Sequence, residues 1–194
     1  MNLTATIFVE GDADLKFVTD FVKLRFDCLL KRGVEIQETG GKDSLHRYTT
    51  RFQESTDLGL TNLLIFDANG SFDTRKTDLS KKTVDLKISF ESFLFPNDSD
   101  SGDLEVLLEN IVNPDYKQIL PCFVKFQDCL KSLDKPQIKV PDRKAKVFLY
   151  ASVLSSNEEA KEVNRNYMNL ALWNLESDYL KPLFDFLSPY FVKE

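Results

Sequence analysis

The chain begins with short apolar runs separated by longer segments in which apolar residues recur every three or four positions. Residues 4–9 (TATIFV) and 62–66 (NLLIF) are mostly apolar or β-branched, and residues 34–37 (VEIQ) alternate between apolar and polar. Helical spacing covers residues 12–31 and 45–54. Strands that alternate with helices in this way are typical of a parallel sheet covered on both faces. The pattern therefore predicts the order β-α-β-α-β.

Beyond the third strand the pattern is mostly helical. A polar stretch at residues 74–82 leads to an extended segment at 86–90 and then to the sequence FLFPN at 93–97. Residues 131–142 contain two prolines and are expected to form a surface connection. Helices are predicted for four later segments, which are residues 103–112, 116–133, 144–154 and 179–192.

These elements predict an α/β protein with a mostly parallel sheet, helices on both faces and a helical C-terminal extension. We expect residues 1–112 to form the α/β core and residues 113–194 to form a mostly helical extension packed on it, as a single compact domain. The chain has 194 residues, 42% of them hydrophobic, and its 16 phenylalanines can fill a substantial core. Trp173 is expected in this core or on a partner surface, and Asp43 or Ser44 is expected to cap the second helix.

Charge and cysteine content narrow the classes of function. The net charge of −6 argues against a broad basic surface for duplex nucleic acid, because such binding depends on neutralising phosphates. The cysteines Cys28, Cys122 and Cys129 form no CxxC pair and are interpreted as core thiols. No signal peptide and no run of about 20 apolar residues is found, so we expect a cytoplasmic location and no membrane partner.

Acidic residues occur where the predicted strands end. Glu10 follows the first strand and Asp67 follows the third, and ligands of open parallel sheets gather at the carboxyl ends of strands. Several carboxylates without an available histidine or cysteine suit Mg²⁺ or Mn²⁺ rather than zinc. Further candidates on helix starts or loops are Asp14, Asp103, Glu105 and Asp73, the last of which is better interpreted as a surface acid.

Each of these acids also has a simpler interpretation, which the sequence leaves open. Glu10 could end a strand at the surface, and Asp67 could form a turn before Asn-Gly. Asp14 could be a first-turn acid that interacts with the helix dipole, and Glu105 could be a solvated residue of the same kind. Asp103 could simply cap its helix. The argument for a site comes from their joint placement.

The turn at residues 40–43 (GGKD) is a second candidate element. Its backbone N–H groups could hold a phosphate at the following helix start, with Lys42 as a point charge, and a plain turn is the alternative. Lys144 could reach a phosphate or remain solvated. The lone His46 is interpreted as a half-exposed structural imidazole. The candidate phosphate-binding residues are Gly11, Gly41, Lys42 and Lys144.

Two of these segments resemble the Toprim domain shared by topoisomerases, DnaG-type primases, OLD-family nucleases and recombination proteins. Residues 7–14 (IFVEGDAD) and 65–69 (IFDAN) are similar to its strand ending in Glu-Gly and its later strand ending in Asp-x-Asp. The turn at 40–43 and the segments 93–97 and 102–105 look closer still to small stand-alone Toprim-like proteins of uncharacterised function. The resemblance covers about residues 4–112 and implies a Toprim-like, Rossmann-like fold.

The resemblance also implies roles for individual residues. In that family the strand-one Glu is a general acid or base and the Asp-x-Asp pair holds Mg²⁺, so Glu10 is the catalytic candidate and Asp67 a metal ligand. Asp14 and Glu105 match further acids of the OLD-like branch. The second Asp of the pair is Asn69 here, which keeps a carbonyl ligand but loses a negative charge. The metal candidates are Asp14, Asp67, Asn69, Asp73, Asp103 and Glu105.

Three functions remain open from the sequence. The first is Mg²⁺-dependent phosphodiester chemistry, nuclease-like, on DNA or RNA. The second is a non-catalytic Toprim-like module that binds an ATPase or a nucleic-acid-processing complex, and the third is a phosphohydrolase acting on a small nucleotide. No GxxxxGK[ST] loop is found, so an ATPase would be a separate chain. The candidate partners are DNA or RNA, that ATPase chain and a second copy of this chain in a homodimer.

Overall fold

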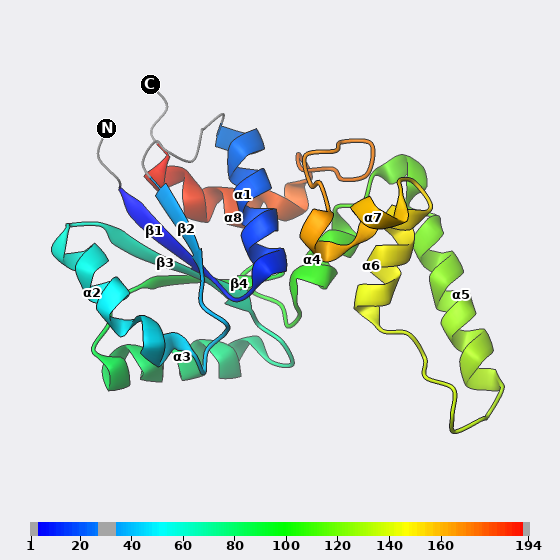
Figure 1. The fold of residues 1–194 in the computed structure, drawn as a ribbon, viewed down its shortest axis with the longest axis horizontal. Coiled ribbons are helices and arrows are strands. Elements are labelled where there is room, and N and C mark those ends of the chain that lie inside the picture. The colour runs from blue at the N-terminus through cyan, green and yellow to red at the C-terminus, as the bar shows by residue number, and fades with distance from the viewer. Residues whose placement is uncertain (1–3, 27–33, 192–194) are drawn as a thin grey trace.

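The computed structural model describes residues 4–26 and 34–191. Within them, four strands form an all-parallel sheet in the order β2-β1-β3-β4 (Figure 1). The strands are β1 (Ala5–Val9), β2 (Val34–Glu38), β3 (Thr61–Asp67) and β4 (Glu91–Phe95). The predicted α/β class is therefore confirmed. The predicted continuation of the first helix over residues 27–31 lies outside the described residues.

The two central strands bring their carboxyl ends to the same edge of the sheet. Every residue of β1 is buried, and so are the five central residues of β3, as expected for strands with neighbours on both sides and helices on both faces. In the parallel register Val9 is paired with Ile65. Glu10, which follows Val9, and Asp67, the last residue of β3, therefore lie close together where the strands end.

Helices cover both faces of the sheet (Figure 1). On one face, Ile7, Ile65 and Phe93 belong to a core cluster. This cluster also contains residues of α1 (Asp12–Phe26), α4 (Leu104–Asn110) and α8 (Lys181–Leu187). On the other face, Phe8 stacks on Phe52 with 3.9 Å between ring centroids. That face is covered by two helices, α2 (Thr49–Asp57) and α3 (Phe72–Leu86).

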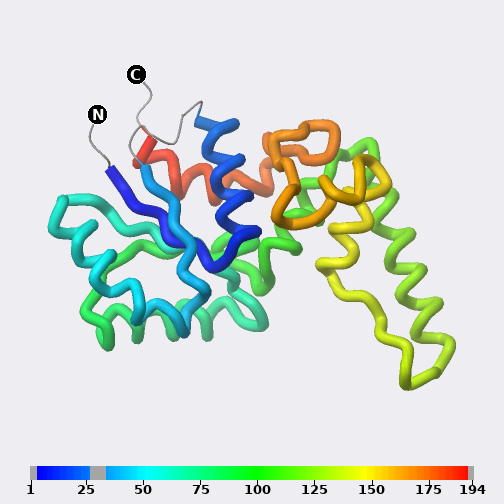
Figure 2. Tube along the Cα trace, viewed as in Figure 1, coloured from blue at the N-terminus to red at the C-terminus, as the bar shows by residue number. Residues whose placement is uncertain are grey.

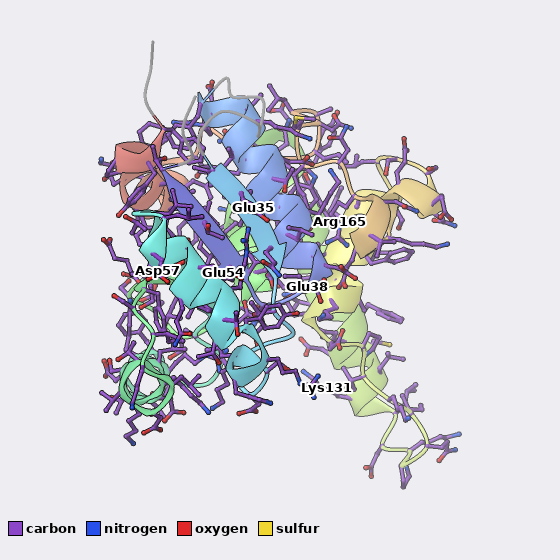
Figure 3. All side chains as sticks on the ribbon, turned by 60° about the vertical axis from the view of Figure 1, so that its left-hand side comes forward. Glu35, Glu38, Glu54, Asp57, Lys131 and Arg165 are labelled. Carbon is purple, nitrogen blue, oxygen red and sulfur yellow. The ribbon has the colours of Figure 1, made fainter. Side chains whose placement is uncertain are left out.

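The C-terminal part of the chain contributes to the same core. Trp173 is fully buried and packs on Tyr150 and Tyr167, which confirms its predicted place in the core. The helices of this part before α8 are α5 (Ile119–Ser132), α6 (Arg143–Ser152) and α7 (Asn157–Ala160). The end of α5 and the loop to α6 stand away from the sheet, and Figure 3 shows Lys131 on this projecting part (Figures 2 and 3).

Several short segments are 3-10 helices. The helix predicted over residues 45–54 begins as one of them and continues as α2 to Asp57. The predicted cap was wrong, because Ser44 makes no side-chain cap and the residue before α2 is Tyr48. The 3-10 segments are Leu45–Tyr48, Pro114–Tyr116, Glu162–Asn164, Asp178–Leu180 and Ser188–Tyr190.

The largest error in the predicted elements concerns α3. The polar stretch at residues 74–82 is helical, and the extended segment predicted at 86–90 is wrong, because the helix runs to Leu86 and the strand begins only at Glu91. Ser71 caps the helix by accepting a hydrogen bond from the Thr74 N–H. The helix lacks an apolar stripe, and its two buried residues are Arg75 and Leu79.

The interpretation of the cysteines as core thiols was also wrong for two of them. Cys122 and Cys129 are exposed on α5, whose inward side is formed by buried Phe123 and by partly buried Ile119 and Leu120. Cys28 lies outside the described residues. His46 is exposed, and its Nδ1 lies 2.8 Å from the carbonyl oxygen of Asp43, consistent with a structural imidazole.

Candidate functional site

Glu10 and Asp67 meet at the end of the two central strands. The backbone N–H of Asp67 donates a hydrogen bond to Glu10 Oε2 at 3.2 Å. The Asp67 carboxylate turns toward α4 and accepts the N–H of Leu104 at 3.0 Å. Burial, together with repulsion from Glu10, Asp103 and Glu105, raises the pKa of Asp67 to about 7, although the Leu104 N–H opposes the rise.

Asp14 joins this pair from the first turn of α1. Its side chain is buried and accepts the backbone N–H of Gly11 at 2.9 Å, which holds it against the end of β1. Burial is the largest cause of a pKa well above the ordinary value, and repulsion from Asp67, Glu10 and Glu105 adds to it. Asp14 and Asp67 therefore interact although they lie far apart in the sequence.

The start of α4 supplies two more acids. Asp103 caps the helix by accepting the N–H of Val106 at 2.9 Å, as its simpler interpretation required. Glu105, in the first turn, is 6% exposed, and burial raises its pKa. We call Glu10, Asp14, Asp67, Asp103 and Glu105 the acidic cluster.

A backbone bridge fixes the start of α4 against the end of β3. The N–H of Asn69 donates to the carbonyl oxygen of Gly102 at 2.5 Å. A Cβ on Gly102 would lie 2.9 Å from the Val106 side chain, and its φ is +148°, so glycine is required there. This contact places Asp103 and Glu105 beside Asp67.

Basic side chains are paired with three members of the acidic cluster. Arg75 Nη2 lies 2.7 Å from Glu10 Oε2, and Arg143 Nη1 lies 3.3 Å from Asp103 Oδ1. Lys144 Nζ lies 3.8 Å from Glu105 Oε1 and 3.5 Å from Glu162 Oε1. Asp14 and Asp67 have no such ion pair within the described residues.

The side chains as they stand do not form a closed metal site. Across residues 4–26 and 34–191, no three Asp, Glu, His or Cys side chains lie close enough together to coordinate one ion. The acids nevertheless interact electrostatically, because each of Asp14, Asp67 and Glu105 has its pKa raised by at least one other member of the cluster.

Two candidate metal ligands lie at the margin of the cluster. Asn69 is exposed, has φ of +56°, and its side-chain amide donates to the carbonyl oxygen of Asp67 at 3.4 Å. Asp73 is exposed in the first turn of α3, and no contact described for it reaches Glu10, Asp14 or Asp67. Both remain predictions, and Asp73 has the position of a surface acid.

The candidate phosphate-binding residues surround the same edge but are already engaged. The Gly11 N–H donates to Asp14, and Lys42 Nζ forms an ion pair with Asp78 on α3 at 3.0 Å. Gly41 is buried with φ of +87°, and a Cβ there would lie 3.0 Å from Glu10 Oε1. The glycine turn thus packs directly on the Glu10 carboxylate.

Arg75 is the residue of this region that sequence reasoning missed. It is 6% exposed, and its guanidinium lies over the Phe66 ring at 5.5 Å from the centroid. The available signal was weak. Ser71 as a helix cap would have placed Arg75 at the end of the first turn and Leu79 one turn further on the same side, and these are the two buried residues of α3.

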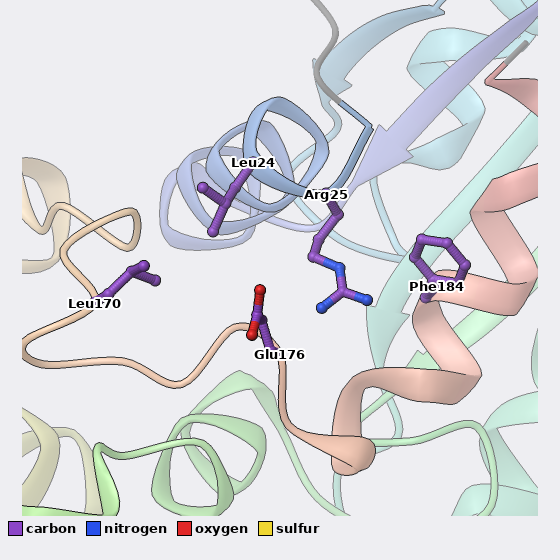
Figure 4. Close-up of a pocket in the computed structure, with 5 residues that line it drawn as sticks. All are labelled: Leu24, Arg25, Leu170, Glu176 and Phe184. Atoms are coloured by element: carbon purple, nitrogen blue, oxygen red, sulfur yellow. The ribbon is translucent and has the colours of Figure 1, made fainter. Parts of the chain in front are cut away.

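Three recesses lined by described residues lie apart from the acidic cluster. One of about 510 Å³ lies between the end of α1, the segment before α8 and α8 itself (Figure 4). It is lined by Leu24, Arg25, Leu170, Glu176 and Phe184. Among the described residues, no helix has both the length and the hydropathy needed to cross a bilayer.

A family model described as "Protein of unknown function (DUF3226)" matches residues 4–192. The chain belongs to this family. No curated protein matches the sequence. Two similar solved structures are C-terminal regions of OLD proteins. The one from Xanthomonas campestris pv. campestris is 12% identical, and the match covers 94% of this chain and 91% of that chain with a TM-score of 0.49. The one from Burkholderia pseudomallei is 16% identical, and the match covers 98% of this chain and 99% of that chain with a TM-score of 0.48.

Proposed function

We propose that this chain is a Toprim-like, Mg²⁺-dependent phosphodiesterase with nuclease-like action on DNA or RNA. The observation that carries the proposal is the pair formed by Asp14 and Asp67. Both have raised pKa values, both lie at the carboxyl edge of the sheet, and neither has an ion-pair partner within the described residues. Acids gathered in this way favour a divalent cation as their counter-charge.

The chemistry of the donors fits Mg²⁺ or Mn²⁺. The acidic cluster offers carboxylate oxygens only, which are the ligands these hard cations prefer. Asp14 and Asp67 would hold the ion, with Glu105 and Asp103 as further donors once Lys144 and Arg143 give way. The bound ion would supply a Lewis acid that offsets negative charge on a phosphate oxygen.

The remaining residues have roles that follow from their positions. Glu10, whose side chain is 28% exposed, would take a proton from the attacking water or give one to the leaving oxygen. Lys42, on the turn beside it, and Lys144, at the start of α6, carry positive charge toward the edge where a phosphate would lie. The N–H groups of Gly11 and Gly41 are the candidate backbone donors to that phosphate.

The test is an assay on single- and double-stranded DNA and RNA and on mononucleotides, with Mg²⁺, Mn²⁺ or a chelator. The proposal expects cleavage of a polynucleotide that requires the metal. Hydrolysis of mononucleotides alone would favour the phosphohydrolase of small nucleotides, and no hydrolysis of any substrate with either metal would contradict the proposal.

A second candidate is a non-catalytic Toprim-like module that binds a separate ATPase chain or a nucleic-acid-processing complex. The specific observation in its favour is that Arg75, Arg143 and Lys144 already balance three of the acids. Asn69, which stands where the Toprim pair has its second Asp, also favours the non-catalytic candidate. This candidate expects no binding of Mg²⁺ at millimolar concentration.

Asn69→Asp provides a prediction about the place of Asn69 in the proposed metal site. An aspartate tolerates the left-handed backbone at φ +56° about as well as asparagine does, so the fold should be kept. If Asn69 faces the metal, the added charge is expected to tighten Mg²⁺ binding about tenfold, which corresponds to one close charge interaction of about 1.4 kcal/mol. Calorimetric titration of both proteins measures this, and unchanged affinity would place Asn69 outside the metal's surroundings.

A further inference from the structure

Arg75 is bound to Glu10 more closely than a surface cation would be. The ion pair joins Nη2 to Oε2 at 2.7 Å, and 7% of the Arg75 side chain is exposed. Its Nε–H is buried and has no hydrogen-bond partner among the described residues. Burying a guanidinium with one donor unpaired costs free energy, and the ion pair with Glu10 offsets part of that cost.

The geometry assigns different surroundings to the two oxygens of Glu10. Oε2 accepts hydrogen bonds from Arg75 and from the Asp67 N–H. Oε1 faces the glycine turn, where a Cβ on residue 41 would lie 3.0 Å from it. Both carboxylate oxygens of Glu10 are therefore already engaged, Oε2 by Arg75 and the Asp67 N–H and Oε1 against the glycine turn.

We infer that Arg75 is a positioning residue that withholds Glu10 from the metal and keeps it free for proton transfer. The inference rests on the proposed function and specifies it, because it divides the acidic cluster into Asp14 and Asp67, which bind the cation, and Glu10, which does not. Without Arg75, the positive charge beside Glu10 is lost and its carboxylate is free to turn toward the cation.

The experiment compares the full-length wild type with Arg75→Met, Arg75→Lys and Arg75→Met combined with Glu10→Gln. Mn²⁺ is the probe, and its binding is measured by electron paramagnetic resonance of the free ion. Lys76→Met is the matched control, since Lys76 is the next residue of α3 and forms an ion pair with Asp98 at 2.8 Å, away from the acidic cluster. Hydrolysis of the polynucleotide cleaved by the wild type is measured in parallel.

Arg75→Met is expected to bind Mn²⁺ at least fivefold more tightly and to lower kcat at least 50-fold. Arg75→Lys keeps the charge and should restore wild-type affinity and part of kcat. Adding Glu10→Gln should abolish the gain in affinity, and Lys76→Met should change neither quantity. A merely structural role for Arg75 would weaken Mn²⁺ binding instead.

The outcomes separate this inference from the proposed function. An active wild type with unchanged or weaker Mn²⁺ binding in Arg75→Met would overturn the role of Arg75 alone. Tighter Mn²⁺ binding in Arg75→Met without hydrolysis by any protein would support the role of Arg75 and contradict the phosphodiesterase. Absence of Mn²⁺ binding in both proteins would contradict both.

Discussion

Glu10→Gln combined with Asp67→Asn is expected to lower metal-dependent hydrolysis by about 10³-fold or more. The first substitution removes the group that would transfer a proton, which typically contributes 10²–10⁴-fold. The second removes the charge of Asp67, which forms no ion pair among the described residues. Both replacements are nearly isosteric, and an asparagine side chain at position 67 can still accept the Leu104 N–H, so the fold should be retained.

Single-turnover rates at saturating Mg²⁺ measure this effect, and circular dichroism checks that the variants are folded. The control is Glu54→Gln combined with Asp57→Asn on α2, two residues for which no contact with the acidic cluster is described. That pair removes the same charges and should keep the wild-type rate. Activity that survives in the Glu10 and Asp67 double variant would remove the enzymatic proposal.

Asp67→Asn alone is expected to stabilise the metal-free protein at pH 8. The folded state holds Asp67 with a pKa of about 7, whereas an unfolded aspartate titrates near 3.9. At pH 8 the folded protein must keep a buried, repelled carboxylate ionised, and asparagine removes that cost. Allowing for partial exposure to solvent, the gain is on the order of 2 kcal/mol, or about 4–8 °C in Tm.

The sign of the pH dependence follows from the raised pKa. Between about pH 4 and pH 7 the folded state binds more protons than the unfolded state, so stability falls as pH rises through this window. The advantage of Asp67→Asn should therefore be absent near pH 4 and complete above pH 7. Chemical denaturation at a series of pH values measures it.

Two comparisons complete this prediction. Asp78→Asn is the control of opposite sign, because the hydrogen bond from Lys42 lowers the pKa of Asp78, and it should not stabilise the protein. Mg²⁺ at about 100 times its Kd should raise the free energy of unfolding of the wild type by about 2.7 kcal/mol, and its Tm accordingly. The same Mg²⁺ concentration should leave the Tm of Asp67→Asn unchanged. A metal-free Asp67→Asn protein that is less stable than wild type at pH 8 would contradict the electrostatic description of the site.

Much of this arrangement could be predicted from the sequence because it depends on strongly apolar strands. The runs that contain Ile7 and Ile65 are long enough to indicate buried parallel strands, and parallel strands end at a common edge. Glu10 and Asp67 come directly after those runs, and the structure brings them into hydrogen-bond contact. The proximity of Glu10 and Asp67 could therefore be predicted from sequence patterns of a few residues each.

The counter-charges could not be predicted in the same way. Arg75 lies on α3, whose outward residues are polar and give no apolar period, and the prediction therefore missed the helix together with its buried arginine. Arg143 and Lys144 reach the acidic cluster because α6 packs beside α4, although more than 30 residues separate the two helices in the sequence. Such contacts depend on tertiary packing, which carries no signal in the spacing of nearby residues.

The most direct measurement of the central claim is calorimetric titration of Mg²⁺, with Mn²⁺ as a second ion, into the wild type and into Asp14→Asn combined with Asp67→Asn. We predict saturable binding to the wild type, loss of at least 100-fold in affinity in the double variant, and unchanged binding in Asp57→Asn. Equal affinities in the wild type and the double variant, or no binding to the wild type at millimolar concentration, would contradict the claim that these two acids require a divalent cation.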